Sequence, residues 1–83
     1  MSARRTLLMA ERVVPASDRA QYVVALRETQ ARCEAAGVHF WVFEHERDHS
    51  RYLEFVETKD AATLDALGLD SASTSRWHAV ELA

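Results

Sequence analysis

The sequence predicts a small α+β domain with the element order β-α-β-β-α-β. Four segments are rich in β-branched, aliphatic or aromatic residues, which is typical of strands. Two segments carry apolar residues at helical spacing. A short polar link joins the two central strand segments and favours an antiparallel hairpin. With 83 residues, the chain is expected to form a single domain over residues 1–83.

The first strand and the first helix are expected in the N-terminal half. Residues 5–14 form an aliphatic run that stops before Pro15, and alternate side chains of this strand point to opposite faces. A helix over residues 18–35 follows, with Ser17 as its N-cap and Gly37 at its end. The buried stripe of this helix is expected to hold Tyr22, Val23, Leu26, Gln30 and Cys33.

The other elements are expected to be strands at 39–46 and 51–58, a short helix at 59–67 and a last strand at 76–82. If the two central strands pair around the link 47–50, alternation sorts their side chains onto two faces. One face is expected to hold Phe40, Val42, Glu44, Arg51, Leu53, Phe55 and Glu57. The other is expected to hold His39, Trp41, Phe43, His45, Tyr52, Glu54 and Val56.

Both faces of this hairpin are therefore apolar in the middle, and this feature predicts a homodimer. Two helices cover one face of a four-stranded antiparallel sheet, and the other face is normally polar. An exposed apolar patch of several hundred Å² is rare in monomers. Packing two copies sheet to sheet removes it, and an interface of about 1,600 Å² in total is enough. The alternative is that a loop or the last strand covers this face within one chain.

The element order, the stretch GVHFWVFEHERDHSRYLEFVETKDAATLDAL and a helix just after the third strand resemble the dimeric α/β barrel superfamily. The most similar branch is that of the antibiotic-biosynthesis-monooxygenase-like domains, and the resemblance covers residues 5–68. It implies a ferredoxin-like protomer with two helices on one face of the sheet, a sheet-to-sheet homodimer and a cavity between sheet and helices. It also implies a small aromatic ligand or cofactor-independent monooxygenase-like activity.

Two features depart from the active branches of that family. The E-x-W pattern that often follows the third strand is absent, because Glu57 is followed by Thr58 and Lys59. The chain contains no asparagine, which the haem-degrading branch uses. We therefore expect no haem and no other cofactor, and whether the domain is an enzyme stays open. The alternative function is a non-catalytic dimerisation or regulatory module.

Two sets of side chains could serve a site in such a pocket or at the dimer face. Aromatic rings with a few polar tips suit either role. Glu54 and His39 are the candidate catalytic groups, as a base or acid. The pocket or dimer face is expected to hold Trp41, Phe43, Tyr52, Val56 and Trp77, with His78 nearby. A pocket on the helix side would instead use Phe40, Phe55 and Tyr22.

The segment His45-Glu46-Arg47-Asp48-His49 fits the H-E-x-x-H zinc pattern, but that pattern needs a helix. Here the segment falls at the tip of a hairpin, so we interpret it as a solvated turn and expect no metal site. The alternative is an adventitious metal at the tip, because His45, Asp48 and His49 are ligand types. Cys33, the only cysteine, is expected to be a small buried hydrophobe.

Composition limits the other classes of function. The formal net charge is −3, which gives no basic surface for nucleic acid. The apolar run after Arg4 and Arg5 spans only residues 7–10, too short for a signal-peptide core or a membrane span. A single cysteine cannot form an internal disulfide. We therefore expect a cytoplasmic domain whose partner is a second copy of itself, without nucleic acid or membrane partners.

Overall fold

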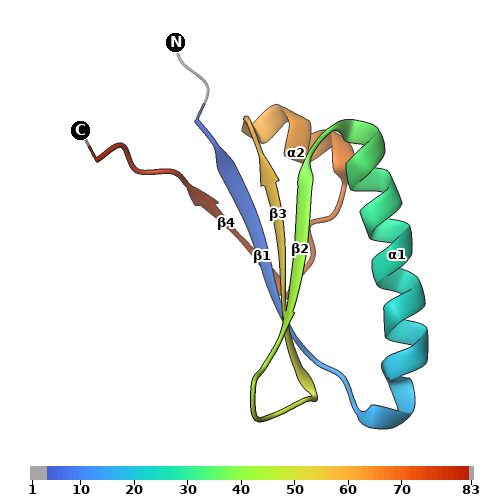
Figure 1. Ribbon diagram of the computed structural model, residues 1–83. Coiled ribbons are helices and arrows are strands. Elements are labelled where there is room, and N and C mark those ends of the chain that lie inside the picture. The colour runs from blue at the N-terminus through green and yellow to red at the C-terminus, as the bar shows by residue number, and fades with distance from the viewer. Residues whose placement is uncertain (1–3, 83) are drawn as a thin grey trace.

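The elements occur in the predicted order in the computed structural model, which describes residues 4–82 (Figure 1). A 3₁₀ turn, Ala16–Asp18, precedes the first helix. The elements are β1 (Thr6–Val13), α1 (Arg19–Ala36), β2 (His39–Glu44), β3 (Arg51–Thr58), α2 (Ala61–Leu67) and β4 (Thr74–His78).

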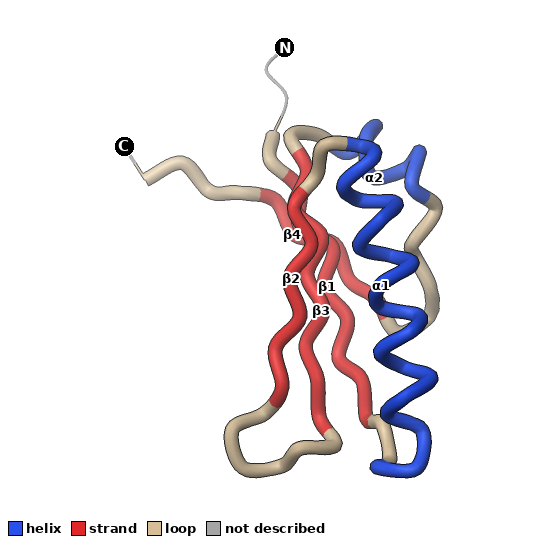
Figure 2. The backbone as a smooth tube through the Cα atoms, turned by 45° about the vertical axis from the view of Figure 1, so that its right-hand side comes forward, coloured by secondary structure: helices blue, strands red, loops and turns tan. Residues whose placement is uncertain are grey.

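The four strands form one antiparallel sheet in the order β2-β3-β1-β4. Figure 2 shows both helices on the same side of this sheet, with α1 running along its length. The predicted α+β, ferredoxin-like fold is therefore confirmed. We call the side of the sheet that carries α1 and α2 the helix face, and the opposite side the outer face.

The core lies between the helix face and the two helices. Its side chains come from β1, β3, α1 and α2, which explains why these four elements hold together. Leu64 of α2 and Cys33 of α1 are fully buried, as predicted for Cys33. The buried cluster contains Leu8, Cys33, Val56, Leu64 and Leu67, with Val38, Phe40 and Leu69 packed against it.

Both helices end on a glycine in the left-handed conformation, at Gly37 (φ 70°) and Gly68 (φ 62°). A Cβ is strained in that conformation, so glycine suits both positions. At the start of α2, the Asp60 carboxylate accepts the Thr63 backbone N–H at 2.8 Å.

Several details differ from the sequence prediction. Among the strand bounds, β2 ends at Glu44 rather than at residue 46, and β4 begins at Thr74 rather than at residue 76. Ser17 is not an N-cap, because it lies in the 3₁₀ turn and α1 begins after Asp18 without a side-chain capping bond. Gln30 is exposed and Thr29 is half-buried in its place. The last strand ends at His78, so residues 79–82 continue beyond the sheet.

Of the helices in residues 4–82, none is long and apolar enough to cross a membrane.

Leu64→Ala tests the core. Leu64 is fully buried, so its truncation should lower the free energy of unfolding by about 2–5 kcal/mol. Val24→Ala is the matched control because Val24 is exposed on α1, and its effect should stay within about 0.5 kcal/mol. Urea denaturation followed by circular dichroism measures both. Equal effects of the two substitutions would contradict this description of the core.

Candidate functional site

The register of the β2–β3 hairpin decides which side chains are available for function. Glu44 pairs with Tyr52 and Trp41 pairs with Phe55. Neighbouring residues in a pair share a face, so Trp41 and Phe43 lie with Leu53 and Phe55. The predicted grouping of Trp41 and Phe43 with Tyr52, Glu54 and Val56 is therefore wrong. A shift of one residue moves every side chain of a strand to the other face.

The physical cause of this shift lies in the hairpin loop. The Ser50 backbone N–H donates to the Asp48 carboxylate at 3.1 Å, in a turn within the link. The His45 Nδ1 accepts the backbone N–H groups of Arg47 (3.1 Å) and Asp48 (2.9 Å). The last hairpin bond then runs from the His45 N–H to the Arg51 carbonyl at 2.8 Å. With these bonds, the loop between the paired residues is one residue longer than the predicted link 47–50.

The H-E-x-x-H-like segment lies in this loop and not on a helix, as predicted. His45 turns its Nδ1 to the loop backbone, and the His49 ring contacts the Glu44 carboxylate at 3.0 Å. In the described part of the chain, no group of three or more His, Cys, Asp or Glu side chains is arranged to hold a metal ion.

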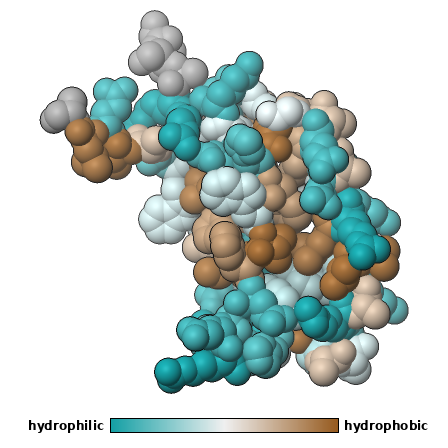
Figure 3. All heavy atoms as spheres, viewed as in Figure 1, coloured by the Kyte–Doolittle hydropathy of each residue, from teal (hydrophilic) through white to brown (hydrophobic). Residues whose placement is uncertain are grey.

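The outer face is the first candidate site. Its large side chains are strongly exposed: Trp41 and Phe43 at 53% and Trp77 at 55%. Phe43 and Phe55 meet edge to face, with ring centroids 5.8 Å apart. Figure 3 shows hydrophobic side chains gathered over the middle of the molecule and hydrophilic ones over the hairpin loop. We define the outer apolar face as Leu7, Met9, Trp41, Phe43, Leu53, Phe55 and Trp77.

Ion pairs frame the outer apolar face at both ends. Arg5 pairs with Glu57 at the end where β2 begins. Arg51 pairs with Glu11 at 2.7 Å toward the hairpin loop. Each end thus carries one positive and one negative side chain, so neither end has an excess of charge from these pairs.

The helix face carries a polar cluster where the hairpin-loop end of the sheet meets the start of α1. The Tyr22 hydroxyl donates to the Glu54 carboxylate at 2.7 Å, and the Arg12 Nε donates to the same oxygen at 3.1 Å. The rings of Tyr22 and Tyr52 lie 4.9 Å apart, and the Tyr52 hydroxyl donates to Glu44 at 3.0 Å. Burial, followed by the Glu54 hydrogen bond, raises the pKa of Tyr22 well above its usual value.

This cluster fastens α1 to the sheet. Its hydroxyls and carboxylates are bonded to one another, and no buried side-chain nitrogen or oxygen in residues 4–82 lacks a hydrogen-bond partner. The adjoining cavity between sheet and α1, which borders Arg12, Phe40 and Glu54, has a volume of about 90 Å³. Typical ligand pockets measure roughly 300–1,000 Å³. The cavity is the size of a few water molecules, at roughly 30 Å³ each.

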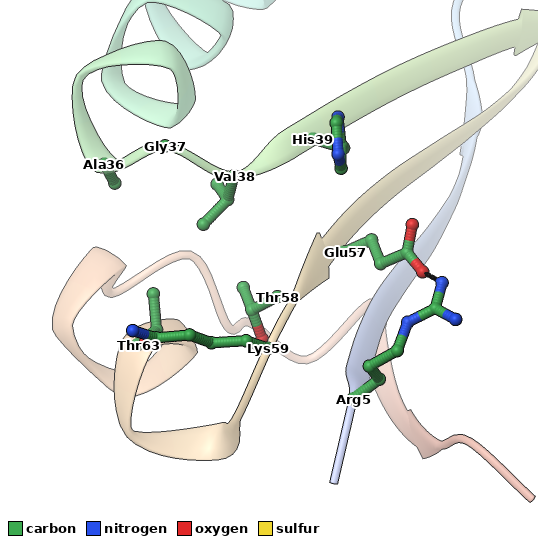
Figure 4. A pocket seen from close by; sticks show the side chains of 9 residues that line it. All are labelled: Arg5, Ala36, Gly37, Val38, His39, Glu57, Thr58, Lys59 and Thr63. Atoms are coloured by element: carbon green, nitrogen blue, oxygen red, sulfur yellow. Dashed lines mark hydrogen bonds and ion pairs between the residues drawn. The ribbon is translucent and has the colours of Figure 1, made fainter. Parts of the chain in front are cut away.

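A larger hollow lies at the end of the sheet where β2 begins, and we call it the β2 hollow. Its volume is about 450 Å³. In Figure 4, Ala36, Gly37 and Val38 lie on one side, and Thr58, Lys59 and Thr63 lie across from them. His39, Glu57 and Arg5 close a third side. Its lining residues are Arg5, Ala36, Gly37, Val38, His39, Glu57, Thr58, Lys59 and Thr63.

The structure separates the side chains that the sequence grouped into one site. His39 lies on the outer face and Glu54 on the helix face, so the two candidate catalytic groups lie on opposite sides of the sheet. Tyr52 and Val56 are buried against the helices. Trp77 does lie on the outer face, and His78 lies on the helix face beside Thr6.

The helix-side alternative is also divided. Phe40 and Tyr22 lie on the helix side, whereas Phe55 lies on the outer face. Leu53 and Phe55 are the members of the outer apolar face that the sequence prediction assigned to the other side of the hairpin.

Neither a protein-family model nor a curated protein matches the chain. Solved structures do resemble it. Protein SO0527 from Shewanella oneidensis aligns with a TM-score of 0.74 at 9% identity, over 94% of this chain and 93% of that one. PA3566 from Pseudomonas aeruginosa aligns with a TM-score of 0.69 at 14% identity, over 100% of this chain and 98% of that one. Both are small bacterial proteins whose names state no activity, and at these identities the likeness shows the fold alone.

Tyr22→Phe tests the polar cluster through its pH dependence. The pKa of Tyr22 is raised in the folded state above the ordinary value of 10.0. The unfolded chain therefore loses the tyrosine proton first, and this contribution to stability is present below about pH 10 and is lost as the pH rises further. Wild type should lose more stability than Tyr22→Phe between neutral pH and about pH 11.

At neutral pH the same variant should be less stable than wild type by about 1 kcal/mol, since the Glu54 hydrogen bond is lost. Urea melts at several pH values give both quantities. Parallel pH profiles for the two proteins would show that Tyr22 is not held in the neutral form by the fold.

Proposed function

We propose that this domain is a homodimerisation module in which the outer apolar faces of two copies pack sheet to sheet. The observation that carries the proposal is the exposure of Trp41, Phe43 and Trp77 at 53–55% on one continuous side of the sheet. Monomers rarely expose a patch of several hundred Å².

The size of the face agrees with a dimer interface. An aromatic side chain buries about 150–250 Å² when it is fully covered. Three rings that are about half exposed therefore leave roughly 250–400 Å², to which Leu53 and the half-buried Phe55 add. A standard interface buries about 800 Å² per partner, so these side chains supply its apolar centre and the surrounding polar residues its rim.

The charges at the rim also permit a second copy. Arg5 with Glu57 and Arg51 with Glu11 are neutral pairs at the two ends of the face. Two copies can therefore approach without like charges meeting at either end. In residues 4–82, neither helix crosses this face, which Figure 2 shows on the side of the sheet away from α1.

The resemblance of the sequence to the dimeric α/β barrel superfamily, in its antibiotic-biosynthesis-monooxygenase-like branch, supports the same arrangement. A domain of this size has a thin core, and sheet-to-sheet packing would extend it. We also infer a cytoplasmic location, since the one thiol, Cys33, is free and buried.

A pocket for an aromatic substrate between sheet and helices is not part of this proposal. The cavity beside Glu54 and Phe40 is about 90 Å³, well below the roughly 300 Å³ of a small ligand site. The β2 hollow is larger, at about 450 Å³, but its described lining includes neither Glu54 nor any Phe, Tyr or Trp ring. Glu54 is bonded to Tyr22 and Arg12, and His39 lies on the other side of the sheet. Nothing in this arrangement favours monooxygenase chemistry over a role in assembly.

Trp41→Arg tests the proposed interface. Wild type should sediment at twice the chain mass of 9.4 kDa at micromolar concentration. A charge on this face should convert the protein to a monomer, because an unpaired charge buried between two copies is costly. Val24→Arg is the matched control, since Val24 is exposed on α1, and this variant should stay dimeric.

Circular dichroism of both variants shows whether each one is folded. A wild-type protein that is monomeric at the highest soluble concentration would overturn the proposal. So would a folded Trp41→Arg variant that dimerises as tightly as wild type.

A further inference from the structure

The chain beyond β4 carries two strongly exposed apolar side chains, Val80 and Leu82. The Ala79 N–H donates to the Arg5 carbonyl at 2.9 Å, which continues the pairing of β4 with the start of β1. After this bond, Val80 is 72% exposed and Leu82 is 93% exposed. Figures 1 and 2 both show residues 79–82 leaving the sheet on the side away from the helices. This is the side on which the proposed partner copy packs.

The β2 hollow opens at the same end of the sheet. His39, Glu57, Leu7 and Trp77 form one row across the four strands, by their pairing. The hollow lies at the β2 end of this row, and segment 79–82 leaves at the β4 end. Within residues 4–82, the segment meets the hollow's lining in its own chain only at Arg5, through the Ala79 N–H, and then leaves from the opposite edge of the sheet.

Between two copies, a two-fold axis parallel to the strands brings the segment of one copy close to the hollow of the other. When two sheets pack face to face about such an axis, β4 of one copy lies opposite β2 of the other, with the same ends together. An axis perpendicular to the strands and between the sheets would instead place β4 opposite β4 with the ends reversed. The parallel axis therefore carries segment 79–82 toward the partner's hollow. Because the axis is two-fold, the contact between segment and hollow forms twice in each dimer.

The chemistry of the segment matches the two sides of the hollow. In an extended chain Val80 and Leu82 share one side, and Glu81 lies on the other. The hollow has an apolar side at Ala36 and Val38 and a cationic group, Lys59, across from it. Lys59 is the only lysine in the sequence and has no ion-pair partner among residues 4–82, whereas Arg5 is already paired with Glu57.

From these matches we propose that segment 79–82 of each copy docks in the β2 hollow of the other copy. Val80 and Leu82 pack on the side formed by residues 36–38, and the Glu81 carboxylate pairs with the Lys59 ammonium. The proposal rests on the sheet-to-sheet dimer and adds to it the symmetry axis and the second contact.

A charge-reversal cycle tests the pairing of Glu81 with Lys59. Glu81→Lys and Lys59→Glu should each raise the dimer dissociation constant by roughly 2- to 30-fold, which corresponds to two exposed ion pairs. The double variant should return toward the wild-type value, because the charges are exchanged. Glu46→Lys is the matched control: it makes the same change of net charge in the hairpin loop and should leave the dissociation constant unchanged.

The location of the segment is tested separately. A nitroxide attached through Leu82→Cys should react only at that position, because Cys33 is buried. In mixed dimers of this protein with ¹⁵N-labelled wild type, it should broaden the amide signals of Val38, His39 and Lys59 in the wild-type copy.

These measurements distinguish failure of the docking of segment 79–82 from failure of the sheet-to-sheet dimer. A stable mixed dimer without this broadening, or a double variant weaker than either single variant, would overturn the docking of segment 79–82 and leave the dimer intact. A wild-type protein that is monomeric would overturn both. Broadening of the same signals only within the labelled chain would show that the segment folds back on its own hollow.

Discussion

The pairing of Glu44 with Tyr52 fixes the orientation of every side chain in β2 and β3. It places Phe40 and Val42 toward the helices and Trp41 and Phe43 away from them. The bonds that set it are local, since the Asp48 carboxylate and the His45 ring hold the backbone of the loop. Once the loop has closed in this way, the alternation of side chains along the strands determines which residues lie on each face.

The two faces then have different physical requirements. The helix face is satisfied within the chain: Leu64 and Cys33 are fully buried, and the polar groups around Tyr22 and Glu54 bond to one another. The outer face keeps three aromatic side chains about half exposed. In the proposed dimer, a second copy would supply the missing contacts without new residues or a cofactor. In that arrangement the domain would be half of a two-layered assembly of sheets.

Much of the fold followed from the sequence because the patterns that define it are local. The aliphatic run before Pro15, the glycines after the helices and the short polar link each predict one element or boundary. Element order and the antiparallel sheet followed from these. The last strand was predicted to reach Leu82, since its apolar alternation continues. However, β4 pairs with β1, which begins at Thr6 opposite His78, so residues 80–82 lie past the start of the strand that would pair with them.

The candidate site was less predictable, because it depends on a single residue in a loop. Trp41, Phe43 and Trp77 share one face, as predicted. The prediction gave them Tyr52 and Val56 as neighbours on β3, whereas the structure gives them Leu53 and Phe55. The sequence did contain a signal: Asp48 followed by Ser50 is typical of an Asx turn, which lengthens the link between the strands. The β2 hollow was not foreseen, since it joins residues 36–39 to residues 57–63 and no local pattern shows that contact.

Both tryptophans of the chain lie on the outer apolar face, so tryptophan fluorescence reports on that face alone. The most direct measurement is acrylamide quenching of this fluorescence as the protein is diluted from high to low micromolar concentration. If a second copy covers the face, quenching should be weak at high concentration and should increase on dilution as Trp41 and Trp77 become exposed. Strong quenching that does not change with concentration would contradict the account.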